Sequence, residues 1–413
     1  MNLIFKVLST VSLSIFFLKG YIELFSLWPN ILNIVALSLI FFIFITSFFL
    51  NRNRKLVHMQ NILFVIGVAL ISGKLNGFSN FDIFFYIRTL ILPAYLFYLF
   101  MFNTNESIRK YNYHLIIFFF ALQIPASWIK LLVFGGPEIE DYIGTVSMYQ
   151  GSMTTLIAGI GAAYSFSKFL YTGNKQFLLI LFLFIVFSQI GGKRMVLFLI
   201  PLVMSFQFII YSRQKNMNIS RYLSLLPIIL FFIMFLTYFV VRLNPSFNKE
   251  EMVWGSFDLK YVMSFVFDYS VRDLNQFDMS RNEALLYFLE YMSNQSVATI
   301  LFGHGSGLLL DYKFSESSGV TELFEVRYGG RMAFVWILLQ TGILGVLTFF
   351  IFLRGLLNRV VKSTTIGFDK LAFYGMYMVV LVDVVFYSMS SLQYFCVMGT
   401  LFGYAAYIEK QVV

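Results

Sequence analysis

The feature that most constrains this chain is a series of long apolar blocks, each about as long as a bilayer is thick. A spanning helix needs about 20 predominantly apolar residues, and the sequence holds about twelve such blocks. It lacks the short alternating segments of a membrane barrel. With 59% hydrophobic and 12% charged residues, the chain has too little polar surface for a water-soluble particle. We therefore expect an all-α, polytopic transmembrane helical bundle.

Lysine and arginine clusters indicate how the bundle is oriented. The expected spans cover approximately residues 3–25, 31–50, 60–76, 82–102, 112–134, 152–170, 177–190, 195–211, 222–242, 332–353, 371–388 and 391–408. Basic clusters follow the even-numbered spans, and short loops rich in Lys and Arg stay in the cytoplasm. Both termini are therefore expected in the cytoplasm. The net charge of +9 then reflects this topology, and we expect no nucleic acid partner.

One expected extracytoplasmic loop, residues 243–331, differs from the others in length. It spans roughly 90 residues, whereas helices of a bundle are commonly joined by about 2–8. Ser280 and Glu283 form a capping-box pattern before an apolar run, which predicts a helix over residues 284–291, packed on or near the bundle. No internal repeat or linker is evident. We predict one integral membrane domain, residues 1–413, with this ordered loop within it.

Two adjacent cations occupy a very short turn that the topology places outside. The turn, residues 191–194, reads Gly-Gly-Lys-Arg. Lys193 and Arg194 could bind a diphosphate, Arg as a bidentate fork and Lys as a point charge. The alternative is a pair that anchors the helix ends beside lipid phosphates. We favour binding, because Lys and Arg are normally depleted from short outward turns, so the topology does not explain their presence here.

Two charged residues fall inside expected spans. Arg88 lies early in the fourth span, where a guanidinium costs a few kcal/mol unless it is paired or faces water. It is a candidate substrate-binding residue, and the alternative is a structural ion pair with Asp82 or another carboxylate of the bundle. Asp383 lies in the eleventh span, where we expect a structural hydrogen bond rather than catalysis.

The loop after the fifth span gathers carboxylates beside an aromatic side chain. Glu138, Glu140 and Asp141 precede Tyr142. Carboxylates can orient sugar hydroxyls and accept a proton, and a tyrosine ring can stack on a sugar. Glu138 is a candidate catalytic residue and the other three are candidate substrate ligands. The alternative is an ordinary solvated loop.

The long loop carries further candidates. Arg281 opens the expected helix, and residues 301–307 read Leu-Phe-Gly-His-Gly-Ser-Gly. Alternate glycines permit a tight turn whose amides could point at an anion, and His304 could serve as a base or donor near neutral pH. The alternative is an ordinary connector before a membrane helix. Arg327 and Arg331, just before the tenth span, are candidate substrate ligands or interfacial anchors. The histidines are scattered and no metal-binding motif occurs, so we expect no metal.

These features together resemble the O-antigen polymerase and ligase superfamily, specifically the Wzy-type polymerases of bacterial surface polysaccharides. The likeness rests on the number of spans, the Gly-Gly-Lys-Arg turn, Ser280-Arg281 ahead of Leu-Phe-Gly-His-Gly, and the Gly-Ile-Leu-Gly sequence at residues 342–345. It covers mainly residues 185–350, and the first half matches only in hydropathy. The resemblance implies a GT-C-like fold and a metal-independent, inverting glycosyltransferase without a cofactor.

The resemblance also implies a substrate and a location. The substrate would be an undecaprenyl-diphosphate-linked oligosaccharide, polymerised on the periplasmic side of the bacterial inner membrane during lipopolysaccharide biosynthesis, with membrane lipid and a chain-length regulator as further partners. Outward arginines of such proteins hold the lipid diphosphate, a role that carries over to Arg194 and Arg281. Ligases have a histidine and then a small polar residue where this chain has Gly330 and Met332. A polymerase is therefore favoured over a ligase.

A lipid-linked oligosaccharide flippase or transporter is the alternative from another class. Such proteins also have about twelve spans and buried charges. The long outward loop, the absence of paired repeats, and spans not conspicuously broken by proline or glycine speak against it.

Overall fold

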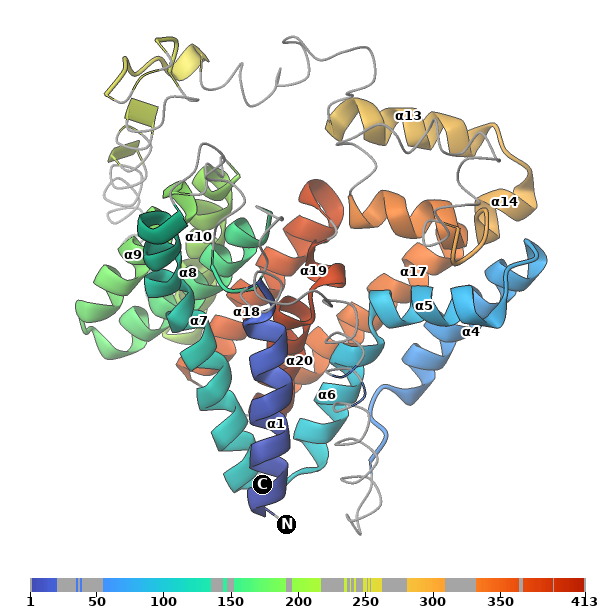
Figure 1. The fold of residues 1–413 in the computed structure, drawn as a ribbon, viewed down its shortest axis with the longest axis horizontal. Helices are drawn as coiled ribbons and strands as arrows, with labels where there is room; N and C mark the ends of the chain where they lie inside the picture. Colours follow the sequence, from blue (N-terminus) through green and yellow to red (C-terminus); the bar gives the residue numbers. More distant parts are fainter. Residues whose placement is uncertain are drawn as a thin grey trace. The chain divides into compact units, whose positions relative to one another are not determined.

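The computed structural model describes residues 2–20, 35, 38, 55–134, 144–146, 152–190, 195–216, 234–235, 238, 241–242, 248–250, 252, 254–261, 281–308, 332–363, 367–388 and 390–411. Within these ranges the regular structure is helical and no strand occurs, which confirms the all-α prediction (Figure 1). The chain divides into two compact units, one of Met1–Phe119, Leu274–Thr365 and Val380–Val413, and the other of Phe120–Asp273 and Ile366–Val379.

Among the described residues, helices coincide with ten of the twelve predicted apolar blocks. The blocks at 31–50 and 222–242 lie almost entirely outside those residues. The first unit holds α1 (Asn2–Phe17), α4 (Met59–Leu75), α5 (Asn80–Leu90), α6 (Leu92–Asn103), α13 (Arg281–Ser293), α14 (Val297–Phe302), α17 (Ala333–Lys362), the π-helix η4 (Asp383–Tyr387), α19 (Ser390–Gln393) and α20 (Phe395–Glu409). The second holds α8 (Ser152–Thr172), α9 (Gln176–Ile190) and α10 (Val196–Gln214). Two further helices, α7 (Glu106–Phe134) and α18 (Phe368–Val382), contribute residues to both units.

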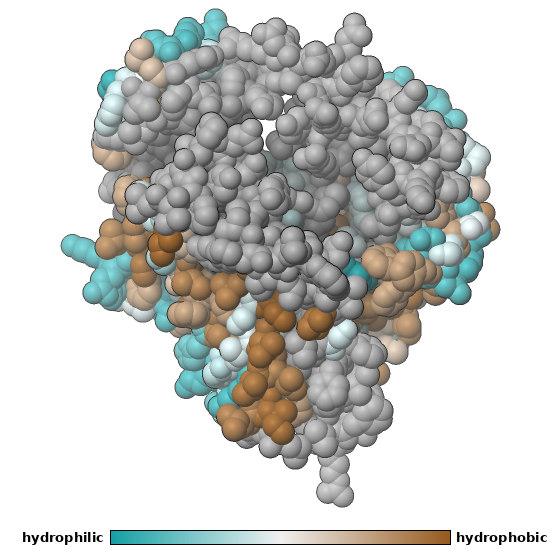
Figure 2. All heavy atoms as spheres, in the orientation of Figure 1, coloured by the Kyte–Doolittle hydropathy of each residue, from teal (hydrophilic) through white to brown (hydrophobic). Residues whose placement is uncertain are grey.

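Several helices are long and apolar enough to cross a membrane, so this is a membrane protein. Among the described residues, Glu106–Ile129, Ala333–Lys362 and Phe368–Tyr387 meet both criteria, and the bent pair of α5 and α6 would make a fourth span. The helices α1, α4, α9 and α20 are apolar but shorter. In Figure 2 apolar side chains gather along α1, where Leu3, Ile4 and Val7 are exposed. Lipid would cover such a face.

The expected fourth span is not one straight helix. It consists of α5 and α6, which meet at Ile91 with a bend of 57°. A capping box starts α5, in which Ser79 accepts a hydrogen bond from the Asp82 amide and Asp82 accepts one from the Ser79 amide. Pro93 lies in the first turn of α6, where its fixed φ suits a helix and its missing N–H costs nothing. The sequence therefore starts a new helix here.

The helix α17 is also broken. Gly342 has φ 65° and ψ −166°, so the carbonyl groups of the preceding turn lose their donors within the helix. The Leu339 carbonyl instead accepts from the His304 amide at 2.7 Å, and the Gln340 carbonyl from the Gly305 amide at 3.1 Å. The Ser72 hydroxyl also donates to the Gln340 carbonyl, at 2.6 Å. A break inside an apolar helix needs such internal partners, because lipid offers none.

Two glycines let the backbone segments at this break touch. A Cβ atom on Gly303 would lie 2.5 Å from the Gln340 carbonyl carbon, and one on Gly342 would lie 2.4 Å from the Leu301 carbonyl oxygen. Both residues have positive φ, 74° and 65°. No other residue type fits either position without moving a backbone.

The helix predicted over residues 284–291 is confirmed as α13. Its buried Phe288 and Met292 pack with Met332, Val335 and Leu339 around the start of α17. The helix thus lies on the first unit, as expected. Ser280, the predicted cap, lies outside the described residues.

Candidate functional site

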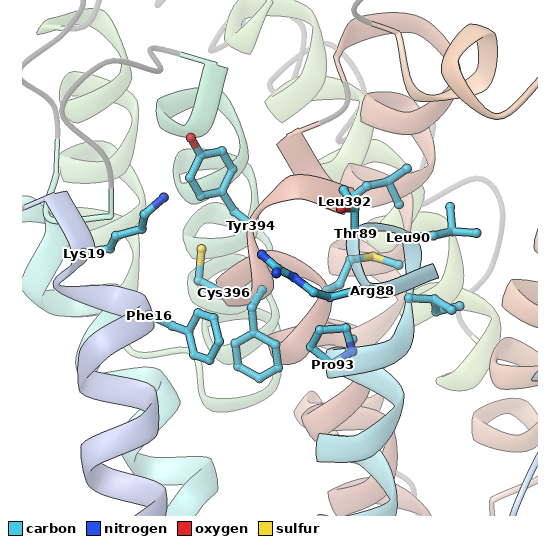
Figure 3. Close-up of a pocket in the computed structure, with 13 residues that line it drawn as sticks. Phe16, Lys19, Arg88, Thr89, Leu90, Pro93, Leu392, Tyr394 and Cys396 are labelled. Atoms are coloured by element: carbon cyan, nitrogen blue, oxygen red, sulfur yellow. The ribbon is translucent and has the colours of Figure 1, made fainter. Parts of the chain in front are cut away.

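A cavity of about 110 Å³ opens beside the break between α5 and α6 (Figure 3). Its walls come from the last residues of α5, the first of α6, the end of α1 with nearby Lys19, and the junction of α19 with α20. All of these segments belong to the first unit. Pockets for drug-sized ligands measure about 300–1,000 Å³, so this one suits a compact group rather than a whole oligosaccharide.

Two cations reach the cavity. Arg88 extends from α5 toward Tyr394 and Cys396, and Lys19 extends from the residues after α1 toward the same space (Figure 3). The Arg88 guanidinium carbon lies 4.7 Å from the Phe85 ring centroid. The Lys19 ammonium lies 5.4 Å from that of Tyr394. Two positive charges beside one small cavity favour an anion between them.

The first turns of two helices contribute residues to the wall of the same cavity. The helix α6 starts after Ile91 and α20 starts after Tyr394, and neither residue gives a side-chain cap to its helix. The first amides of a helix lack intrahelical partners and carry partial positive charge. Phosphate and carboxylate groups bind at such ends. The amide dipoles therefore add to the charges of Arg88 and Lys19.

The structure decides against the ion pair considered for Arg88. Asp82 bonds with Ser79 in the capping box, and within the described part of the chain Arg88 forms no ion pair with a carboxylate. Of the predicted site residues whose side chains the structure describes, Arg88 lines the cavity and His304 does not.

His304 lies in a different environment. Its Nε2 atom is 3.1 Å from the Tyr291 hydroxyl, and burial lowers the pKa of the imidazole, which favours the neutral ring. It does not line the cavity.

The prediction that the glycine-rich turn presents its amides to an anion is wrong. The amides of His304 and Gly305 donate to carbonyls of the broken α17, and the Gly307 amide donates to the Gln340 side chain at 3.0 Å. These amides are used within the protein, because they donate to acceptors at the break in α17.

The other predicted site residues cannot be placed. Arg281 is the first residue of α13, but its side chain lies outside what the structure describes. The same holds for the whole of Lys193, Arg194, Glu138, Glu140, Asp141, Tyr142, Arg327 and Arg331. Their roles stay predictions.

The expectation for Asp383 is confirmed. Its carboxylate accepts hydrogen bonds from the Ser388 hydroxyl at 2.5 Å and the Ser391 amide at 2.8 Å. These bonds tie η4 to α19. Asp383 is therefore a structural residue.

Sequence reasoning missed Lys19 and Tyr394 as site residues. Lys19 carried a usable signal, since a lysine in an apolar block has the same cost as Arg88. Tyr394 carried none, because the end of α19 is not visible in hydropathy. Within the described ranges, no group of three or more His, Cys, Asp or Glu side chains could hold a metal ion. No model of a known protein family matches the chain, and a comparison with curated proteins found no relative.

Proposed function

We propose that this protein is a Wzy-type polymerase of a bacterial surface polysaccharide, joining undecaprenyl-diphosphate-linked repeat units with release of undecaprenyl diphosphate. The observation that carries the proposal is the cavity in which Arg88 and Lys19 meet the N-termini of α6 and α20. Its positive charge suits a diphosphate, and its apolar helices suit the attached lipid. The residues 185–350 that resemble such polymerases support the same function.

The proposed reaction is a metal-independent, inverting transfer. A sugar hydroxyl of one repeat unit attacks the anomeric carbon of a second lipid-linked chain, and the bond from that carbon to the diphosphate oxygen breaks. The electron pair leaves with the diphosphate, where fixed cations and helix amides stabilise the growing charge. The hydroxyl proton passes to Glu138 or His304. A diphosphate is a good leaving group, so a weak base is enough.

The remaining predicted residues have roles in the same proposal. Lys193, Arg194, Arg281, Arg327 and Arg331 would bind the lipid diphosphates. Glu140, Asp141 and Tyr142 would orient the sugar.

The proposed topology has about twelve spans in a GT-C-like bundle, with both termini cytoplasmic and residues 243–331 on the periplasmic side of the inner membrane. One observation supports the orientation. Lys410, at the end of α20, interacts electrostatically with Arg109, Lys55 and Arg359. These three residues come after three different even-numbered spans in the sequence. These clusters therefore share one end of the first unit, as the positive-inside rule requires.

Substitution of the two cavity cations tests the proposal. In Arg88→Gln and Lys19→Gln we expect polymerisation of purified lipid-linked repeat units to fall by about 100-fold, the effect of losing one transition-state donor. Arg88→Lys should keep part of the activity. Lys175→Gln, an exposed cation in the second unit, is the matched control. Wild-type product ladders from both cavity variants would overturn the assignment.

A transporter of lipid-linked oligosaccharide is the second candidate, and the helix breaks favour it. The expectation that the spans are unbroken is wrong for both α5–α6 and α17. Broken helices often form transport sites. A transporter would move labelled lipid oligosaccharide across vesicles without changing its mass, whereas a polymerase lengthens it. A ligase would give no ladder without a second acceptor.

A further inference from the structure

A strained tryptophan stands out in the second unit. Trp254 has φ 67°, in the left-handed region that a bulky side chain rarely adopts. Its side chain is nevertheless 54% exposed, so core packing does not impose the conformation. Strained backbone persists only where the surroundings fix it, and it gathers at ligand sites.

Arg242 fixes this backbone. The Trp254 amide donates to the Arg242 carbonyl at 2.6 Å. In return the Arg242 side chain donates to the carbonyls of Trp254 at 3.2 Å and Gly255 at 3.1 Å. Its guanidinium carbon lies 5.6 Å from the Trp254 ring centroid and 5.5 Å from that of Tyr238. One cation therefore holds the strained backbone and lies against the indole.

A buried asparagine supports the same loop from inside. Asn248 donates to the carbonyls of Val241 at 3.3 Å and Met252 at 2.8 Å, and accepts from the Met252 amide at 3.2 Å. A Cβ atom on Gly255 would lie 2.1 Å from its side-chain oxygen. The loop is therefore closely packed beneath an exposed tryptophan.

Further charged groups belong to the same loop. Lys249 and Asp258 form an exposed ion pair, and the Glu250 carboxylate accepts from the Ser256 amide. These bonds lower the pKa of Asp258 and of Glu250, so both stay ionised near neutral pH. An exposed aromatic ring in a loop that also carries ionised carboxylates suits a ligand with apolar C–H faces and many hydroxyls.

We propose that Trp254 is a stacking platform for a sugar ring of the oligosaccharide, presented by Arg242 in a loop that also carries Glu250 and Asp258. This inference deepens the proposed function and rests on it for the identity of the sugar. Exposed Met252 and Leu259 raise the rival possibility of a membrane anchor. An anchor needs only apolar area, however, and neither a strained backbone nor flanking carboxylates.

Fluorescence quenching separates the platform from the anchor. The difference between the full-length protein and its Trp254→Phe variant isolates the emission of Trp254 in lipid nanodiscs. The probe is lipid-free oligosaccharide, released by mild acid from the lipid-linked repeat units. We expect it to protect Trp254 from aqueous iodide. Quenching of Trp254 by brominated lipid, with no protection by oligosaccharide, would overturn the proposal in favour of the anchor.

Substitutions at the same position test the role independently of folding. Trp254→Gly removes the indole and suits φ 67°, so its thermal stability should equal or exceed that of the wild type. We expect it to bind the oligosaccharide about tenfold more weakly, the effect of one lost stacking contact. Trp254→Phe should lose less than about threefold. The matched control, Trp128→Phe, replaces an exposed tryptophan of α7 and should bind as the wild type does.

Binding and polymerisation are scored separately. Unchanged binding by Trp254→Gly overturns the platform, whatever the polymerase activity. Tight binding by a wild type that forms no ladder leaves the platform standing and removes the proposed polymerase.

Discussion

At the scale of single residues, the polar groups inside apolar helices carry the information about function. Arg88 violates the expected composition of a span and lines the cavity, whereas Asp383 violates it equally and is used in hydrogen bonds to Ser388 and Ser391. The sequence could single out both residues, because each is costly in lipid. It could not separate their roles, which depend on whether a neighbour supplies donors.

His58 gives a prediction about pH. Burial, and then the charge of Arg359, lower its pKa from 6.5 to about 4, and its Nε2 has no hydrogen-bond partner among the described residues. Between these two pH values, His58 is therefore more protonated in the unfolded chain than in the folded protein. The stabilising contribution of neutral His58 is complete above pH 6.5 and is lost as the pH falls toward 4.

His58→Asn should therefore flatten the dependence of the melting temperature on pH between 7 and 4.5, with a residual slope from His304. Asparagine tolerates the φ of 63° at this position. His114→Asn, at an exposed site in α7, should keep the wild-type slope. If the melting temperature of His58→Asn changed with pH as steeply as that of the wild type, His58 would not be the source of the pH dependence. Thermal unfolding in detergent measures all three.

At the scale of elements, hydropathy located the helices and missed their breaks. The block at 82–102 is apolar throughout, so it predicts one span, yet the chain turns by 57° at Ile91. Pro93 was the available signal. Gly342 carried less, since an isolated glycine is common in membrane helices. Its break depends on donors at His304 and Gly305, whose pairing with α17 no local pattern reveals.

Gly342→Ala should destabilise the protein by several kcal/mol. Its φ of 65° and ψ of −166° fall in a region nearly confined to glycine, which costs an alanine about 1–3 kcal/mol. The added Cβ would also collide with Leu301. The control is Gly67→Ala in α4, where nothing lies within 4 Å of the added atom. That variant should be neutral or up to about 1 kcal/mol more stable. Equal melting temperatures for the two variants would show that the break in α17 is not required.

At the scale of the whole molecule, the sequence predicted an all-helical membrane protein because composition and block length decide that class. It could not predict two compact units, since contacts between distant segments decide them. Most of the predicted cations of the site lie outside the described residues, so their convergence is still a prediction.

Cysteine labelling tests the proposed orientation. Cys396 is buried and can be replaced by alanine to give a cysteine-free background. Ser293→Cys in α13 and Gln411→Cys after α20 then place one exposed thiol each. A membrane-impermeant maleimide should label Ser293→Cys in intact spheroplasts and Gln411→Cys only after lysis. Labelling of both from the same side would contradict the topology.

The contact between Gly303 and Gly342 has an evolutionary consequence. The two positions lie far apart in the sequence, yet each can hold a glycine usefully only while the other does. Substitutions at the two positions should therefore be coupled. In descendants of a common ancestor, both glycines persist together, or an unbroken helix replaces the joint and both sites accept larger residues.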